Sequence, residues 1–140
     1  MKKYVEKIRK KYRTSDPFEL AQCLNIVVLF EDLGSINGYF NTVCRQRFIH
    51  INQNLTEPEV RLTLAHEIGH VLLHPNTNTY FLRSKTRFSV GSFEQEANLF
   101  AVCLLIEDEE LFEHREFSTY QLSALFGIPE ELVRLRVEQR

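Results

Sequence analysis

The chain has 140 residues, of which 44% are hydrophobic and 26% are charged, and its formal net charge at pH 7 is -2. These values are ordinary for a globular protein, and the length predicts one domain over residues 1–140. A net charge so close to zero gives no basic surface for binding nucleic acid or a membrane. No segment has the apolar length of a membrane span or signal peptide, so we expect a cytoplasmic protein.

The first half of the chain predicts two short helices followed by three strands. Apolar residues recur at helical spacing within residues 1–13, and Ser15-Asp16-Pro17 has the residue types that begin a second helix. β-Branched and aromatic residues dominate 25–30, 38–43 and 48–52, with turn residues between the first two runs. We therefore expect an α+β fold with N-terminal helices and a three-stranded sheet, antiparallel or mixed.

The three cysteines, Cys23, Cys44 and Cys103, lie far apart and show no C-x-x-C spacing. This pattern argues against both a disulfide framework and a thiolate metal site. We expect reduced, mostly buried thiols, in keeping with a cytoplasmic protein.

A helix predicted over residues 57–74 carries the motif His66-Glu67-Ile68-Gly69-His70. Thr56 and Glu59 have the spacing of a capping box at its start. Because helix positions four apart lie on one face, His66 and His70 can each offer an imidazole nitrogen to the same ion. Glu67 lies beside that pair, where it can reach a bound water. This H-E-x-x-H pattern predicts zinc-dependent peptide hydrolysis.

A catalytic zinc has three protein ligands and one open position, so the motif needs a third ligand. His74 is the nearest candidate, but residues eight apart on a straight helix are separated by about 12 Å along its axis. We therefore expect His74 to interact with the carbonyl groups at the helix end. The better candidate is Glu94, which opens a helix predicted over residues 94–106.

Two other polar residues of that helix bear on the same site. Asn98 lies four positions after Glu94 on the same face, where it can accept the N–H of a ligating histidine. Glu96 points about 200° away from Glu94 and is expected to face solvent. Glu96 remains the alternative third ligand. Both glutamates could instead serve only to stabilise the start of their helix, where the helix dipole favours acidic side chains.

Two further segments complete the chain. Residues 75–93 show no sustained periodicity and are predicted as a long loop, which is typical of functional or disordered segments. Residues 117–138 have the apolar spacing and central glycine of a helix-turn-helix pair. Glutamates offset the arginines of this pair, so we expect a structural or partner-docking element and no direct binding to nucleic acid.

The stretches 61–74 and 94–101, with Ile49-His50-Ile51-Asn52 upstream, resemble the ImmA/IrrE-type metallo-endopeptidases, which are often encoded beside repressors in phages and integrative elements. The likeness covers most of the chain. One departure is Leu104-Leu105-Ile106-Glu107, where relatives usually read Leu-Leu-Met-Pro. This changes how the helix ends and affects no expected ligand.

The resemblance implies a small zincin-like domain in which the motif helix pairs with the helix that carries a glutamate ligand. It implies His66, His70 and Glu94 as zinc ligands, although manganese and iron also suit such a set. It implies Glu67 as the catalytic carboxylate. For many relatives the protein substrate is a helix-turn-helix repressor of a phage or mobile element, and a monomer is favoured here.

Several roles stay open at the level of the sequence. Tyr39, Tyr80, His50 and His114 are candidates for the donor that stabilises the tetrahedral oxyanion. A strand edge at 38–43 is a candidate for holding an extended substrate by strand addition. The alternative function is a zinc-stabilised regulatory binding module with little or no proteolytic activity.

Overall fold

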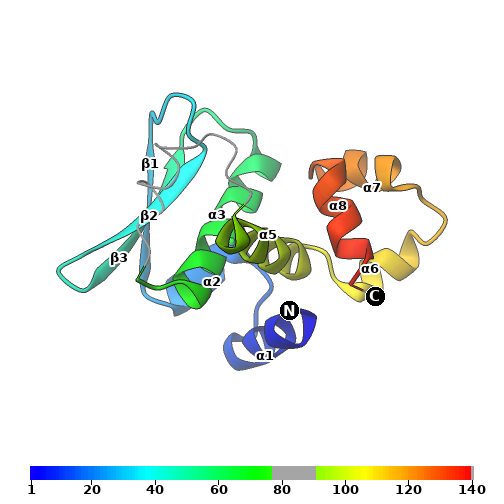
Figure 1. Ribbon diagram of the computed structural model, residues 1–140, viewed down its shortest axis with the longest axis horizontal. Coiled ribbons are helices and arrows are strands. Elements are labelled where there is room, and N and C mark those ends of the chain that lie inside the picture. The colour runs from blue at the N-terminus through cyan, green and yellow to red at the C-terminus, as the bar shows by residue number, and fades with distance from the viewer. Residues whose placement is uncertain (77–90, 140) are drawn as a thin grey trace.

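A computed structural model describes residues 1–76 and 91–139 of the chain (Figure 1). The predicted order of N-terminal helices, a three-stranded sheet and a helical second half is confirmed. Most of the predicted loop at 75–93 lies outside the described residues. The elements are α1 (Lys2–Tyr12), α2 (Pro17–Cys23), β1 (Ile26–Glu31), β2 (Gly38–Val43), β3 (Gln46–Asn52), α3 (Glu57–Leu73), α5 (Ser92–Leu105), α6 (Asp108–Glu113), α7 (Thr119–Phe126) and α8 (Glu130–Val137).

The sheet is mixed, with the strand order β1-β3-β2. The central strand β3 pairs in parallel with β1 and antiparallel with β2. A two-residue turn joins β2 to β3, and both of its residues, Cys44 and Arg45, have left-handed backbones with φ of 51° and 66°. Such a turn matches the twist of a hairpin. Because β3 is central in the order β1-β3-β2, β2 lies at an edge of the described sheet.

The two faces of the sheet differ in character. Phe40, Ile49 and Ile51 are fully buried on the face that α3 covers. Side chains alternate along a strand, so His50 and Tyr39 lie on the opposite face. Val27 and Leu29 of β1 remain partly exposed there. One face of the sheet therefore forms the core and supports the motif helix.

The helix α3 is buried along most of its length. Its nine residues from Thr63 to Val71 are all buried, because the sheet covers one side and α5 packs on the other. The predicted capping box is confirmed at its start, where the Thr56 backbone N–H donates to Glu59 at 2.9 Å. Gly69 allows close approach of α5, since a Cβ there would lie 3.1 Å from the Phe100 ring and 3.3 Å from the Ala97 Cα.

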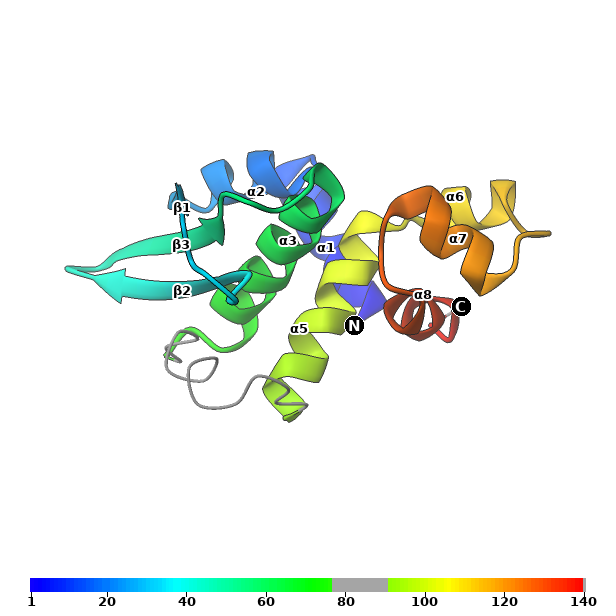
Figure 2. The same cartoon turned by 90° about the horizontal axis from the view of Figure 1, so that it is seen from above.

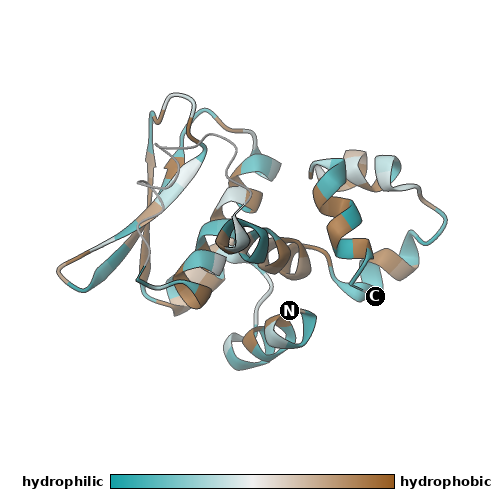
Figure 3. Cartoon of the chain, viewed as in Figure 1, coloured by the Kyte–Doolittle hydropathy of each residue, from teal (hydrophilic) through white to brown (hydrophobic). Residues whose placement is uncertain are grey.

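A second, smaller apolar cluster joins the C-terminal helices α6, α7 and α8 to the C-terminal half of α5. Val102 and Ile106 pack there against Leu122, Ile128 and Val133. Figure 2 shows α6, α7 and α8 at the opposite end of the molecule from the β2-β3 hairpin. Hydrophobic residues dominate the C-terminal half of α5, whereas α1 is mostly hydrophilic (Figure 3). The predicted helix pair at 117–138 is confirmed as α7 and α8, with Gly127 in a left-handed conformation between them.

The cysteine prediction is only partly confirmed. All three are free thiols and Cys103 is buried, but Cys23 and Cys44 are exposed. Cys44 is exposed because it occupies the hairpin turn, and Cys23 is the last residue of α2. Among the described residues, no helix combines the length and the apolar character needed to cross a bilayer.

Candidate metal centre

Three side chains predicted from the sequence converge between α3 and α5. His66 and His70 lie one turn apart on α3, and Glu94 comes from the first turn of α5. The Nε2 atom of His66 is 2.8 Å from Oε2 of Glu94, and the Nε2 atom of His70 is 2.9 Å from Oε1. One potential ligand atom from each of the three residues lies within 4.8 Å of the others. The fold thus brings together donor atoms separated by 28 residues.

The chemistry and burial of these groups suit a divalent cation. His70 is completely buried, His66 is 7% exposed, and the Glu94 side chain is 15% exposed. Two imidazole nitrogens and one carboxylate form a donor set typical of catalytic zinc, and manganese or iron also accepts it. The ring of Phe40 stacks over His70 at a centroid distance of 6.4 Å and provides an apolar wall. The residues present therefore fit the metal that the sequence predicted.

Glu67 lies next to the converging groups and is completely buried. Its Oε2 atom is 3.9 Å from Nε2 of His66, which is too far for a direct hydrogen bond. The distance is short enough for one water molecule to contact both atoms. Neighbouring helix positions diverge by about 100°, so Glu67 cannot face the same point as His66 and His70. This geometry suits a base that acts on a water beside the three donor atoms.

The surroundings of His74 differ from the sequence prediction. Its backbone N–H donates to the His70 carbonyl at 2.7 Å, as expected at a helix end. α3 ends at Leu73, and His74 is the residue that caps it. The ring contacts another side chain and not the terminal carbonyl groups, with its Nδ1 atom 3.1 Å from Nδ1 of His70, four positions earlier. His74 is not one of the three converging donors.

Glu96 and Asn98 also lie on α5 near the site. The Glu96 side chain is 49% exposed, as predicted, but its Oε1 atom also lies 3.3 Å from Nε2 of His74. Asn98 is half-buried. The place predicted for Asn98, beside the second nitrogen of a ligating histidine, is taken at His70 by His74. The contact between Asn98 and a ligating histidine stays a prediction.

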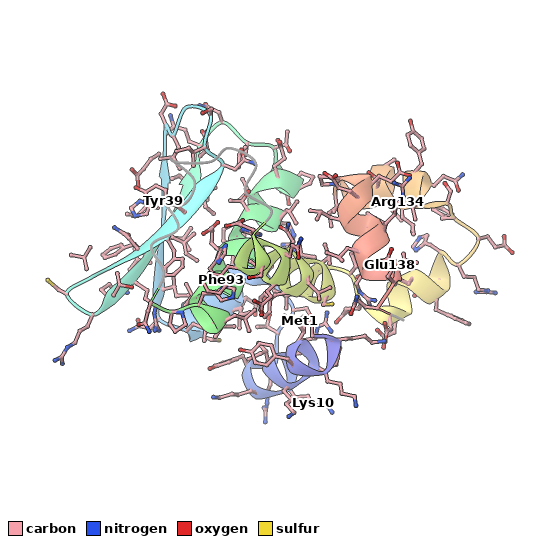
Figure 4. The ribbon with its side chains drawn as sticks, in the orientation of Figure 1. Met1, Lys10, Tyr39, Phe93, Arg134 and Glu138 are labelled. Carbon is pink, nitrogen blue, oxygen red and sulfur yellow. The ribbon has the colours of Figure 1, made fainter. Side chains whose placement is uncertain are left out.

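Three of the four candidate oxyanion donors lie elsewhere in the fold. Tyr39 and His50 stack on each other at 4.3 Å, on the face of the sheet opposite α3. Figure 4 labels Tyr39 on the sheet. His114 follows α6, where its ring packs against Phe117. Tyr80 lies outside the described residues. The oxyanion donor therefore stays unassigned, as does the predicted substrate contact along β2.

Comparison with known proteins agrees with this arrangement. Residues 21–138 match the peptidase family described as IrrE N-terminal-like domain. The matched span contains α3, α5 and the sheet that supports them. The chain belongs to this family and is a metallopeptidase. The resemblance seen in the two sequence stretches is thereby confirmed.

Two relatives extend over nearly the whole chain. Metallopeptidase ImmA of Bacillus subtilis (strain 168) is 30% identical over 145 residues, which cover 99% of this chain and 85% of that protein. Uncharacterized immunity region protein 2 of Bacillus phage phi105 is 40% identical over 139 residues, which cover 97% of this chain and 88% of the phage protein. The similarity therefore includes the C-terminal helices as well as the site.

Proposed function

We propose that this metallopeptidase is a zinc-dependent, cytoplasmic endopeptidase that cleaves a helix-turn-helix repressor of a phage or mobile element. The convergence of His66, His70 and Glu94 beside buried Glu67 is the observation that carries the proposal. The repressor substrate is supported by the resemblance to the ImmA/IrrE type and by similarity to a protein named for a phage immunity region.

In this proposal His66 and His70 hold zinc through their Nε2 atoms, and Glu94 holds it through its carboxylate. When bound, the metal would supply Lewis-acid activation of a water and of the scissile carbonyl group. Glu67 would accept a proton from the attacking water and then deliver it to the nitrogen of the leaving amine. Burial fixes the Glu67 carboxylate next to the reacting groups, which avoids the reorganisation that a mobile base would require.

Incubation of the zinc-loaded protein with a purified helix-turn-helix repressor from the same phage or mobile element tests the proposal. Mass spectrometry of the products would identify the cleaved bond. We expect Glu67→Gln to lower the cleavage rate by at least about 100-fold, because it removes the proton acceptor. Its zinc content and thermal midpoint should stay close to those of the unmodified protein.

Glu109→Gln is the matched control, because it makes the same chemical change at an exposed position of α6. This variant should cleave at the normal rate. An intact repressor after incubation with zinc-loaded protein would contradict the substrate assignment. Equal cleavage by Glu67→Gln and the unmodified protein would contradict the assigned role of Glu67.

A further inference from the structure

A continuous chain of four side chains runs from the converging donors to the surface of α5. Glu94 lies against Nε2 of His70, and Nδ1 of His70 lies 3.1 Å from Nδ1 of His74. Nε2 of His74 in turn lies 3.3 Å from Oε1 of Glu96. His74 is only 7% exposed, and its ring stacks on Phe93 at 4.1 Å with an interplanar angle of 24°. Figure 4 shows Phe93 at the start of α5, beside the end of α3.

The tautomer that a metal requires assigns a direction to this chain of contacts. A histidine that binds a cation through Nε2 keeps its proton on Nδ1, and that N–H needs an acceptor. His70 is completely buried, so water does not satisfy its Nδ1–H and an unpaired donor would be costly. The group in contact with this nitrogen is Nδ1 of His74. His74 can accept at Nδ1 only if its own proton is on Nε2, where Glu96 is placed to accept it.

We infer that His74 is a positioning residue for the metal centre, held by Phe93 and Glu96 so that its Nδ1 accepts from His70 and keeps Nε2 of His70 directed at the metal. The inference rests on the zinc site of the proposed function. It assigns His74 neither to the ligand set nor to the chemical step. Glu96, the weaker ligand candidate in the sequence, orients His74 from the outside.

Two substitutions of His74 separate positioning from packing. His74→Phe keeps an aromatic ring for the stack on Phe93 but offers no acceptor to His70. His74→Asn loses the stack but places an amide oxygen near the position of Nδ1. We expect zinc affinity, measured by competition with a chelator, to fall about 10–100-fold in His74→Phe and much less in His74→Asn.

The thermal midpoint of the metal-free protein provides a readout of packing alone. In the metal-free protein His70 can carry its proton on Nε2, where Glu94 accepts it, so His74→Phe, which keeps the stack on Phe93, should have the higher midpoint of the two variants. His74→Asn should lower the midpoint. A positioning role therefore predicts that His74→Phe has the lower zinc affinity but the higher thermal midpoint of the two variants. His114→Asn, outside the site, is the control and should leave zinc affinity unchanged.

The possible results distinguish this inference from the proposed function. Unchanged zinc affinity in His74→Phe would overturn the inference. The inference would also be overturned if the variant with the larger loss of thermal midpoint also showed the larger loss of zinc affinity. Failure of the unmodified protein to bind one zinc per chain would overturn the metal site and the inference together. Because affinity is measured without a substrate, an incorrect repressor assignment would leave the His74 result intact.

Discussion

The two ends of α5 lie in different kinds of core. Around its first half, α3 contributes nine consecutive buried residues, and Gly69 brings the two helices into close contact. Around its second half, three short helices form a small apolar cluster and leave large side chains such as Phe112 and Tyr120 exposed. The converging side chains of His66, His70 and Glu94 lie in the first of these regions. Apolar close packing therefore sets the spacing between the donor atoms.

The C-terminal region is attached by polar contacts in addition to its small core. Arg136 of α8 is 1% exposed, and its Nε–H donates to the Ile106 carbonyl at 2.7 Å. The same guanidinium lies 2.7 Å from Asp108 at the start of α6, and Lys2 reaches that carboxylate from α1 at 2.9 Å. A change in this region should therefore affect stability without moving the ligands. A change between α3 and α5 should affect both.

The largest effect is expected from Gly69→Val. The added side chain would overlap Phe100 and the backbone of Ala97, which are already close to Gly69. Overpacking at such a contact costs about 2–3 kcal/mol of unfolding free energy. Because α5 must shift, Glu94 would move away from the histidines and zinc affinity would fall as well. Denaturant unfolding and chelator competition measure the two effects, and normal zinc affinity in a destabilised variant would contradict the coupling.

A smaller effect, confined to stability, is expected from Arg136→Ala. The substitution leaves the Ile106 carbonyl without its buried donor, at a cost of about 1–2 kcal/mol. Zinc affinity should not change. Arg134→Ala is the matched control, because Arg134 pairs at the surface with Glu130, four residues earlier, and such pairs contribute about 0.5 kcal/mol or less. Equal stability losses in the two variants would contradict the anchoring role of Arg136.

The smallest effect is a dependence of stability on pH at Asp108. Hydrogen bonds from Arg136 and Lys2 hold the pKa of this carboxyl below its usual range. A lowered pKa in the folded state stabilises the fold above the usual pKa, and the contribution is lost as the pH falls through the lowered value. Because the side chain is 52% exposed, the effect should stay below about 1 kcal/mol. Thermal midpoints can be measured from about pH 5 to about pH 2.5, a range that spans the usual carboxyl pKa of about 4. Over this range the midpoint of Asp108→Asn should fall less steeply than that of the unmodified protein.

Local signals explain why much of the site could be predicted. The spacing of His66 and His70 depends only on helix geometry, and the Thr56–Glu59 capping box established that the helix exists. The choice of Glu94 needed the assumption that a second helix would pack against the first, which small residues such as Ala97 made reasonable. The contact between His74 and His70 joins residues four positions apart, which helix spacing allows, but the prediction considered His74 only as a third ligand and as a partner of the terminal carbonyl groups.

The sequence alone determined the order of elements, the start of the motif helix and the candidate site residues His66, Glu67 and His70, since each depends on neighbours within a few positions. Tertiary structure decided the mixed pairing of β3, the placement of Tyr39 and His50 on the far face of the sheet, and the contact from His74 to Glu96. These features depend on how segments distant in the chain pack together. The H-E-x-x-H motif identified the chemistry, whereas packing between α3 and α5 determines the geometry of the donors.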